Sequence, residues 1–103
     1  MTRLALIADD LTGALDSAVH FAPAMGPIDV IWPGAALPRG AVAIDAGTRE
    51  MATGDARAVM AGLAPLLAPA PDTLSFLKLD SLLRGHAGAD IAAVAGQGFA
   101  HVI

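Results

Sequence analysis

Two adjacent aspartates, Asp9 and Asp10, follow directly after the apolar run LALIA at residues 4–8. Like charges this close repel each other, so a cation or a set of hydrogen-bond donors must relieve the repulsion. The pair could accept hydrogen bonds from ligand hydroxyl groups, hold a metal ion, or provide a general base. The simpler alternative is that Asp10 caps the next helix and Asp9 points to water.

Two further polar clusters follow later apolar runs. The run at residues 41–45 leads into a cluster formed by Asp45, Gly47, Thr48 and Arg49. The run at residues 73–79 leads into KLDSLLRGH, whose candidate residues are Lys78, Asp80, Ser81, Arg84, Gly85 and His86. Guanidinium groups bind carboxylate or phosphate in a forked geometry, and loop amides before a helix can receive an anion. The ordinary alternatives are an ion pair between Arg49 and a neighbouring acid, and helix capping by Asp80 and Ser81.

The elements that must position these clusters alternate along the chain. Stretches at residues 4–8, 28–32, 41–45 and 73–79 predict strands, and the continuous apolar run at residues 4–8 is typical of a strand covered on both faces. Helical spacing predicts helices at residues 12–25, 53–68 and 88–96. This alternation predicts an α/β domain with an open, mainly parallel sheet flanked by helices in three layers. Ligands of such sheets bind beyond the carboxyl ends of the strands, so the three clusters should share one rim.

Local signals give finer expectations at the ends of these elements. Thr12 is a candidate cap for the first helix, which the proline and glycine residues at 23–27 should end. Pro65 should shorten or kink the second helix. Ser81 is a candidate cap for the last helix, and HVI at residues 101–103 should open a fifth strand.

Composition limits the class of protein. A chain of 103 residues makes one domain at most, and with no cysteine it has neither disulfides nor a thiolate metal site. A net charge of −4 disfavours nucleic acid as a partner, and no apolar run is long enough to span a membrane. With no signal-peptide core at the N-terminus, we expect a cytoplasmic protein.

The chain is unusually poor in charged residues. Charged residues make up 16% of the chain against a usual value of about 25%. Mean hydropathy is +0.62, which reflects many alanines and a surface that another domain or a second copy of the chain could cover. We therefore expect the chain to be an incomplete N-terminal part of a longer protein, with homo-oligomerisation as a further possibility.

The three clusters together resemble the N-terminal domain of the four-carbon acid sugar kinases. The matching stretches are IADDLTGALDSA, AIDAGTRE and LKLDSLLRGHAGAD, which span Ile7 to about Asp90. The family pattern joins an acidic-acidic-hydrophobic-Thr-Gly-Ala motif, an Asp-X-X-(Ser/Thr)-Arg motif and Lys-X-Asp-Ser-Thr-Leu-Arg-Gly. The three motifs in this order and combination are specific for the family. The first motif alone would be only a moderately specific signal.

The resemblance implies transfer of the γ-phosphoryl of ATP to a hydroxyl of threonate, erythronate or an oxo-tetronate. This chain would bind the sugar acid, while ATP and Mg²⁺ would lie mainly on a C-terminal nucleotide-binding domain. The implied catalytic residues are Asp10 and Asp80, with no metal ligand in this domain. The implied substrate-binding residues are Asp9, Thr12, Gly13, Asp16, Asp45, Arg49, Lys78, Ser81, Arg84 and Gly85, and His86 is a further candidate from its place in the third cluster.

Two departures from the family pattern stand out. Leu82 occupies a position that usually holds threonine, which removes a hydroxyl beside the anion loop. The chain also contains no glycine-rich phosphate loop followed by Lys-Ser or Lys-Thr. By itself the chain therefore carries no visible nucleotide site.

Three other functions remain open. A non-catalytic sugar-acid-binding or interaction domain is the strongest rival. A receiver-type phosphoacceptor domain would place Mg²⁺ on Asp9 and Asp10 and phosphorylate Asp45, but Lys78 follows Asp45 with only one helix between them. A haloacid-dehalogenase-like phosphatase needs Asp-X-Asp-X-Thr, and Ala8 stands where its nucleophile should be.

Overall fold

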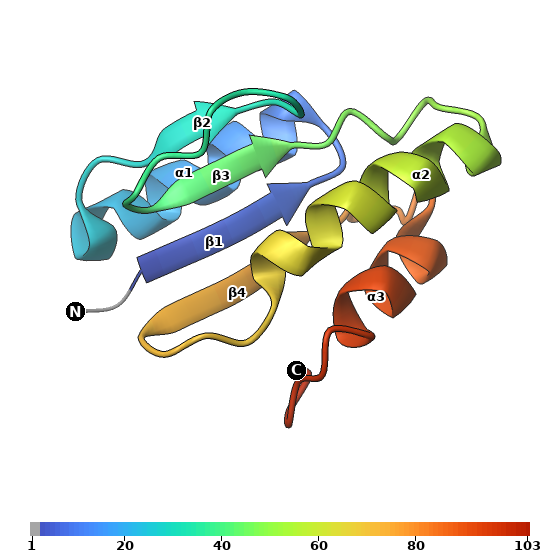
Figure 1. Ribbon diagram of the computed structural model, residues 1–103. Coiled ribbons are helices and arrows are strands. Elements are labelled where there is room, and N and C mark those ends of the chain that lie inside the picture. The colour runs from blue at the N-terminus through green and yellow to red at the C-terminus, as the bar shows by residue number, and fades with distance from the viewer. Residues whose placement is uncertain (1–2) are drawn as a thin grey trace.

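The computed structural model describes residues 3–103, and within them the chain forms a four-stranded parallel sheet and three α-helices (Figure 1). The elements in chain order are β1 (Arg3–Ala8), α1 (Leu11–Met25), β2 (Asp29–Ile31), β3 (Val42–Asp45), α2 (Thr53–Leu63), the 3₁₀ helix η1 (Ala64–Leu67), β4 (Thr73–Lys78) and α3 (Ala87–Ala95). The predicted three-layer α/β fold is confirmed.

The register of the sheet brings three strand ends to one level. The strand order is β2-β3-β1-β4, and every pair is parallel. Ala8, the last residue of β1, pairs with Asp45 of β3 on one side and with Lys78 of β4 on the other. The three polar clusters therefore start at the same rim of the sheet.

Alternating residues of the central strand face two separate cores. Leu4, Leu6 and Ala8 pack under α1 against its small residues Ala14 and Ala18. The other face packs Ala5, Ile7, Val42 and Ile44 against Met60, Leu63 and Leu67 of the α2–η1 segment. Because both faces of β1 are covered, nearly every residue of this strand is apolar and buried.

The first helix starts at Leu11, one residue earlier than predicted, and its cap lies two residues before Thr12. Asp10 is the N-cap, and its Oδ1 accepts a hydrogen bond from the Gly13 amide at 2.8 Å, so the expectation of Thr12 as the cap is wrong. Pro23 lies inside the helix, so the helix continues past this expected stop to Met25. The helix ends at Gly26, whose φ of 77° suits glycine.

The predicted effect of Pro65 on the second helix is confirmed. The α-helical part of this segment ends at Leu63, and the chain tightens into η1 with Pro65 in its first turn. Within residues 3–103, no helix is long and apolar enough to span a membrane.

Two expectations for the C-terminal part are wrong. The last helix begins at Ala87, after His86, whereas Ser81 lies in a separate turn closed by the Leu83 amide donating to the Asp80 carbonyl. Residues 101–103 form no strand, because they lie exposed after α3 with no neighbouring strand to supply hydrogen bonds.

Candidate functional site

Arg49 joins the polar ends of three strands. Its Nη2 donates to Asp9 Oδ1 at 2.9 Å and its Nη1 donates to Asp10 Oδ2 at 2.9 Å. The same Nη2 lies 3.7 Å from Asp80 Oδ1. One guanidinium from the loop after β3 therefore neutralises carboxylates that follow β1 and β4, and the adjacent aspartates are relieved by this cation.

The backbone explains why Arg49 arrives at this point. The Ala46 amide donates to the Ala8 carbonyl at 2.8 Å, and the Arg49 amide donates to the Asp9 carbonyl at 3.2 Å. These bonds extend the contact between β1 and β3 beyond the sheet. The loop after β3 is thus fixed against the residues that follow β1.

Asp9 is buried rather than pointing to water, which corrects the simpler alternative. Only 3% of the residue is exposed, and both of its carboxylate oxygens face Arg49. The hydrogen bond to Asp9 is the main cause of a raised pKa for Arg49, so the guanidinium keeps its charge. A buried carboxylate of this kind is tolerated only because it is paired.

Asp10 has two structural partners. Its Oδ1 caps α1 through the Gly13 amide, while its Oδ2 accepts from Arg49. Gly13 is needed for this arrangement, because a Cβ there would lie 2.7 Å from Asp10 Oδ1 and 3.5 Å from Lys78 Cγ. The capping alternative was therefore correct for Asp10, but the same side chain also belongs to the charged network.

The third motif closes the network through Asp80 and Arg84. Arg84 Nε donates to Asp80 Oδ2 at 2.7 Å, and Nη2 donates to Oδ1 at 3.1 Å. This hydrogen bonding by Arg84 is the main reason that the pKa of Asp80 lies well below its usual range, and the charge of Arg49 lowers it further. The Arg84 side chain itself is 62% exposed, so its charge is accessible from solvent.

Gly85 allows the third motif to approach Arg49 closely. Its φ is 83°, and a Cβ at this position would lie 3.2 Å from Arg49 Cα and 3.4 Å from Asp9 Oδ2. The loop after β4 therefore packs directly on the Arg49–Asp9 pair.

A cavity of about 280 Å³ opens beside this network. It is lined by Asp9, Asp10, Leu11, Asp45, Gly47, Arg49 and Glu50. Four of the seven lining residues are acidic, so the polar groups of the cavity are mainly hydrogen-bond acceptors, together with one guanidinium. Such a surface suits a ligand that carries several hydroxyl groups.

Other predicted site residues do not line this cavity. Lys78 Nζ donates to the Leu79 carbonyl, and His86 Nε2 lies 2.8 Å from the Met51 carbonyl oxygen. Thr12, Asp16 and Ser81 are exposed and form no side-chain hydrogen bond among residues 3–103. The structure therefore unites Asp9, Asp10, Arg49, Asp80, Arg84 and Gly85, with Asp45 at the edge of the cavity.

Sequence reasoning missed several residues around the site. Leu11 and Glu50 line the cavity, and both stand next to residues of the motifs. Thr48 was named in the second cluster, but its burial was not foreseen: its hydroxyl is fully buried and has no hydrogen-bond partner within residues 3–103. Asp90 is only 2% exposed, and the single available signal for it was an acid in the first turn of an apolar helix.

The carboxylates of this rim do not form an open metal site. Arg49 forms ion pairs with Asp9 and Asp10, and Arg84 forms an ion pair with Asp80. Among residues 3–103, no group of three or more acidic or histidine side chains has the arrangement of a metal site. This donor set does not fit the Mg²⁺ ion that a receiver-type domain would bind between its aspartates.

The Asp80–Arg84 pair predicts a dependence of stability on pH. Because the pKa of Asp80 is lower in the folded state, the folded protein gains stability above the ordinary carboxyl pKa of about 3.9 and loses it as pH falls further. We therefore expect the free energy of unfolding, measured with urea, to fall less steeply between about pH 5 and pH 2 in Asp80→Asn than in the wild type. The exposed Asp16→Asn variant should keep the wild-type slope, and an unchanged slope in both variants would contradict the role of Asp80.

The chain thus forms an α/β domain with a polar cavity at the carboxyl ends of its parallel strands, which is where open parallel sheets usually bind ligands. The family model described as the sugar-binding N-terminal domain matches residues 4–103, and the chain belongs to this family. Neither a curated protein nor a solved structure matches the chain. The family match supports the coarser part of the prediction, a sugar-binding N-terminal domain.

Proposed function

We propose that this domain binds a four-carbon sugar acid as the phosphoryl acceptor of an ATP-dependent kinase. The observation that carries the proposal is the convergence of all three motifs on Arg49. The family match supports a sugar ligand, and the motif combination supports the narrower class of threonate, erythronate or an oxo-tetronate.

The chemistry of the rim suits an acid that carries hydroxyl groups. Asp10 and Asp45 line the cavity and would accept hydrogen bonds from the hydroxyls. Arg84 has an exposed guanidinium and would bind the carboxylate, with Lys78 as a second cation nearby. Arg49 would fix the positions of the acceptor groups, because its own donors already serve the aspartates.

Of the two candidate bases, Asp10 suits the role better than Asp80. The two arginines hold Asp80 ionised at a low pKa, which makes it a weak acceptor of a proton. The Asp10 side chain is 29% exposed and lines the cavity, so a ligand hydroxyl can reach it. Phosphoryl transfer depends mainly on positioning and charge neutralisation, so a modest base suffices.

Nucleotide and metal would come from outside this domain. The chain has no glycine-rich phosphate loop, and its rim carboxylates are paired with arginine rather than arranged around a cation. When bound, ATP supplies the phosphoryl group and Mg²⁺ neutralises the phosphate charge. The partner would be a C-terminal nucleotide-binding domain that closes over the rim and excludes water.

Ligand binding tests the acceptor assignment directly. Titration with threonate and erythronate should raise the thermal unfolding midpoint, because a ligand that binds only the folded state stabilises it. Succinate has the same number of carbons and no hydroxyl, so it should have little effect. A protein that no four-carbon hydroxy acid stabilises would contradict the proposal.

Asp10→Asn should separate the kinase from a binding domain without catalysis. In the complete enzyme we expect ATP-dependent phosphorylation of the acid to fall by about 100-fold or more, while binding changes much less. Radiolabelled phosphate transfer and calorimetric titration measure the two quantities. Full turnover in Asp10→Asn would remove Asp10 from the role of base, and wild-type binding without phosphorylation would favour the non-catalytic function.

A further inference from the structure

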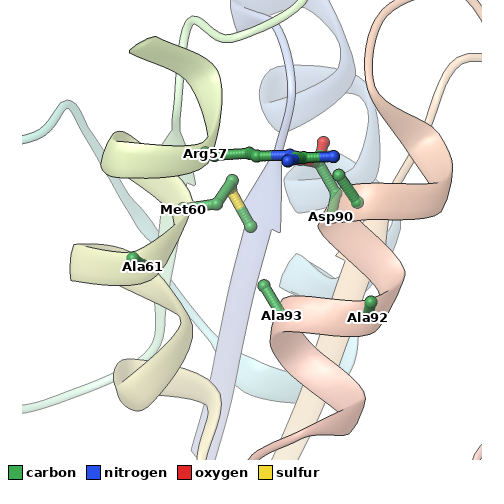
Figure 2. A pocket seen from close by; sticks show the side chains of 7 residues that line it. Arg57, Met60, Ala61, Asp90, Ala92 and Ala93 are labelled. Carbon is green, nitrogen blue, oxygen red and sulfur yellow. The ribbon is translucent and has the colours of Figure 1, made fainter. Parts of the chain in front are cut away.

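A second cavity of about 280 Å³ lies between α2 and α3, and it shares no lining residue with the rim cavity. Arg57, Met60 and Ala61 of α2 form one wall, and Ala89, Asp90, Ala92 and Ala93 of α3 form the other. Figure 2 shows the Arg57 side chain extending from α2 toward α3 at the level of Asp90. The volume equals roughly nine water molecules at about 30 Å³ each, so it fits only a small ligand.

Asp90 gives this cavity an unusual chemical character. Only 2% of the residue is exposed, and its Oδ2 has no hydrogen-bond partner within residues 3–103. Burial raises the pKa of Asp90, and the negative charge of Asp9 raises it further. Leaving a buried carboxylate without a donor is costly, so a donor in the cavity would be strongly favoured.

Arg57 supplies the opposite charge on the facing wall. Among residues 3–103 it forms no ion pair within 4.0 Å, although it lines the same cavity as Asp90. The cavity thus presents a carboxylate and a guanidinium that do not neutralise each other directly. The remaining lining consists of alanines and Met60, which offer only apolar contacts.

We propose that the cavity between α2 and α3 binds a small zwitterionic amino acid, with its ammonium group on Asp90 and its carboxylate on Arg57. An ammonium group donates hydrogen bonds and also neutralises the buried negative charge. A hydroxyl group can donate a hydrogen bond but carries no positive charge. The carboxylate pairs with the guanidinium in the geometry that arginine favours. The site is separate from the sugar-acid site and does not depend on the proposed kinase activity.

Nuclear magnetic resonance titration with L-alanine tests this site. The amide signals of Ala89, Asp90 and Ala93 should shift in a saturable way, while the rim amides of Gly47 and Arg49 should not. L-lactate lacks the ammonium and ethylamine lacks the carboxylate, so each should bind at least about tenfold more weakly. Equal binding of L-lactate would overturn the assignment of an ammonium to Asp90.

Charge-removing variants assign the two contacts. Asp90→Asn preserves the shape of the side chain and should weaken L-alanine binding by about tenfold or more, and Arg57→Gln should do the same. Asp55→Asn removes an exposed acid from α2 outside the cavity and should bind L-alanine as the wild type does. Undiminished binding in Asp90→Asn, or no shift at the cavity amides, would refute the proposal whatever the result with threonate.

Discussion

Replacing Arg49 with methionine should lower the free energy of unfolding by about 3 kcal/mol, because it leaves the buried Asp9 carboxylate without its counterion. The same guanidinium binds Asp10, so Asp9 and Asp10 then repel each other without a cation between them, whereas Asp80 keeps its ion pair with Arg84. Methionine retains much of the apolar volume of arginine, which keeps the loss of packing small. Urea unfolding at neutral pH measures the difference.

Two further variants show that the loss arises from charge. Adding Asp9→Asn to Arg49→Met should recover part of the stability, because the buried residue is then uncharged. Arg39→Met removes an exposed arginine that has no ion pair among residues 3–103, and its effect should stay within about 0.5 kcal/mol. If Arg49→Met and Arg39→Met unfold at the same urea concentration, Arg49 does not hold the site together.

Gly85→Ala should weaken binding of the proposed sugar acid by displacing Arg49. The new Cβ would lie 3.2 Å from Arg49 Cα and 3.3 Å from Arg49 Cγ, so the loop or the arginine must move. The positive φ at this position adds a backbone cost of roughly 1 kcal/mol for any residue with a Cβ. We expect at least about a tenfold loss of affinity for threonate, measured by calorimetry.

Gly34→Ala is the matched control for this change. Gly34 has a φ of 88°, similar to that of Gly85, but no atom lies within 4 Å of its virtual Cβ. Both variants should carry the backbone cost, whereas only Gly85→Ala should lose ligand affinity. Equal affinity in the two variants would mean that close packing of the loop on Arg49 is not required for binding.

The period of the apolar residues was sufficient to predict the α/β architecture. Strands such as residues 4–8 are apolar throughout because both faces are covered, and this signal is local. The rule that ligands bind at the carboxyl ends of parallel strands then predicted that Asp10, Arg49 and Arg84 lie together, which the ion pairs confirm. Pro65 likewise acts through its own ring, so its effect was visible in the sequence.

Two expectations for the C-terminal part of the chain were wrong. Asp80 and Ser81 resemble helix caps, but the Leu83 amide donates to the Asp80 carbonyl and closes a separate turn before the helix begins at Ala87. Residues 101–103 have strand-like composition, yet a strand also requires a neighbour that offers hydrogen bonds. Composition alone cannot supply that neighbour.

The sequence by itself determined which side chains could meet at the rim, because strand direction and apolar period are local properties. Only the tertiary structure decided how they pair, with Arg49 bound to Asp9 and Asp10 and with Asp80 shared between two arginines. It also decided that Asp90 is buried without a partner. Burial and ion pairing depend on distances between segments far apart in the chain, and these distances exist only after the sheet and helices have packed.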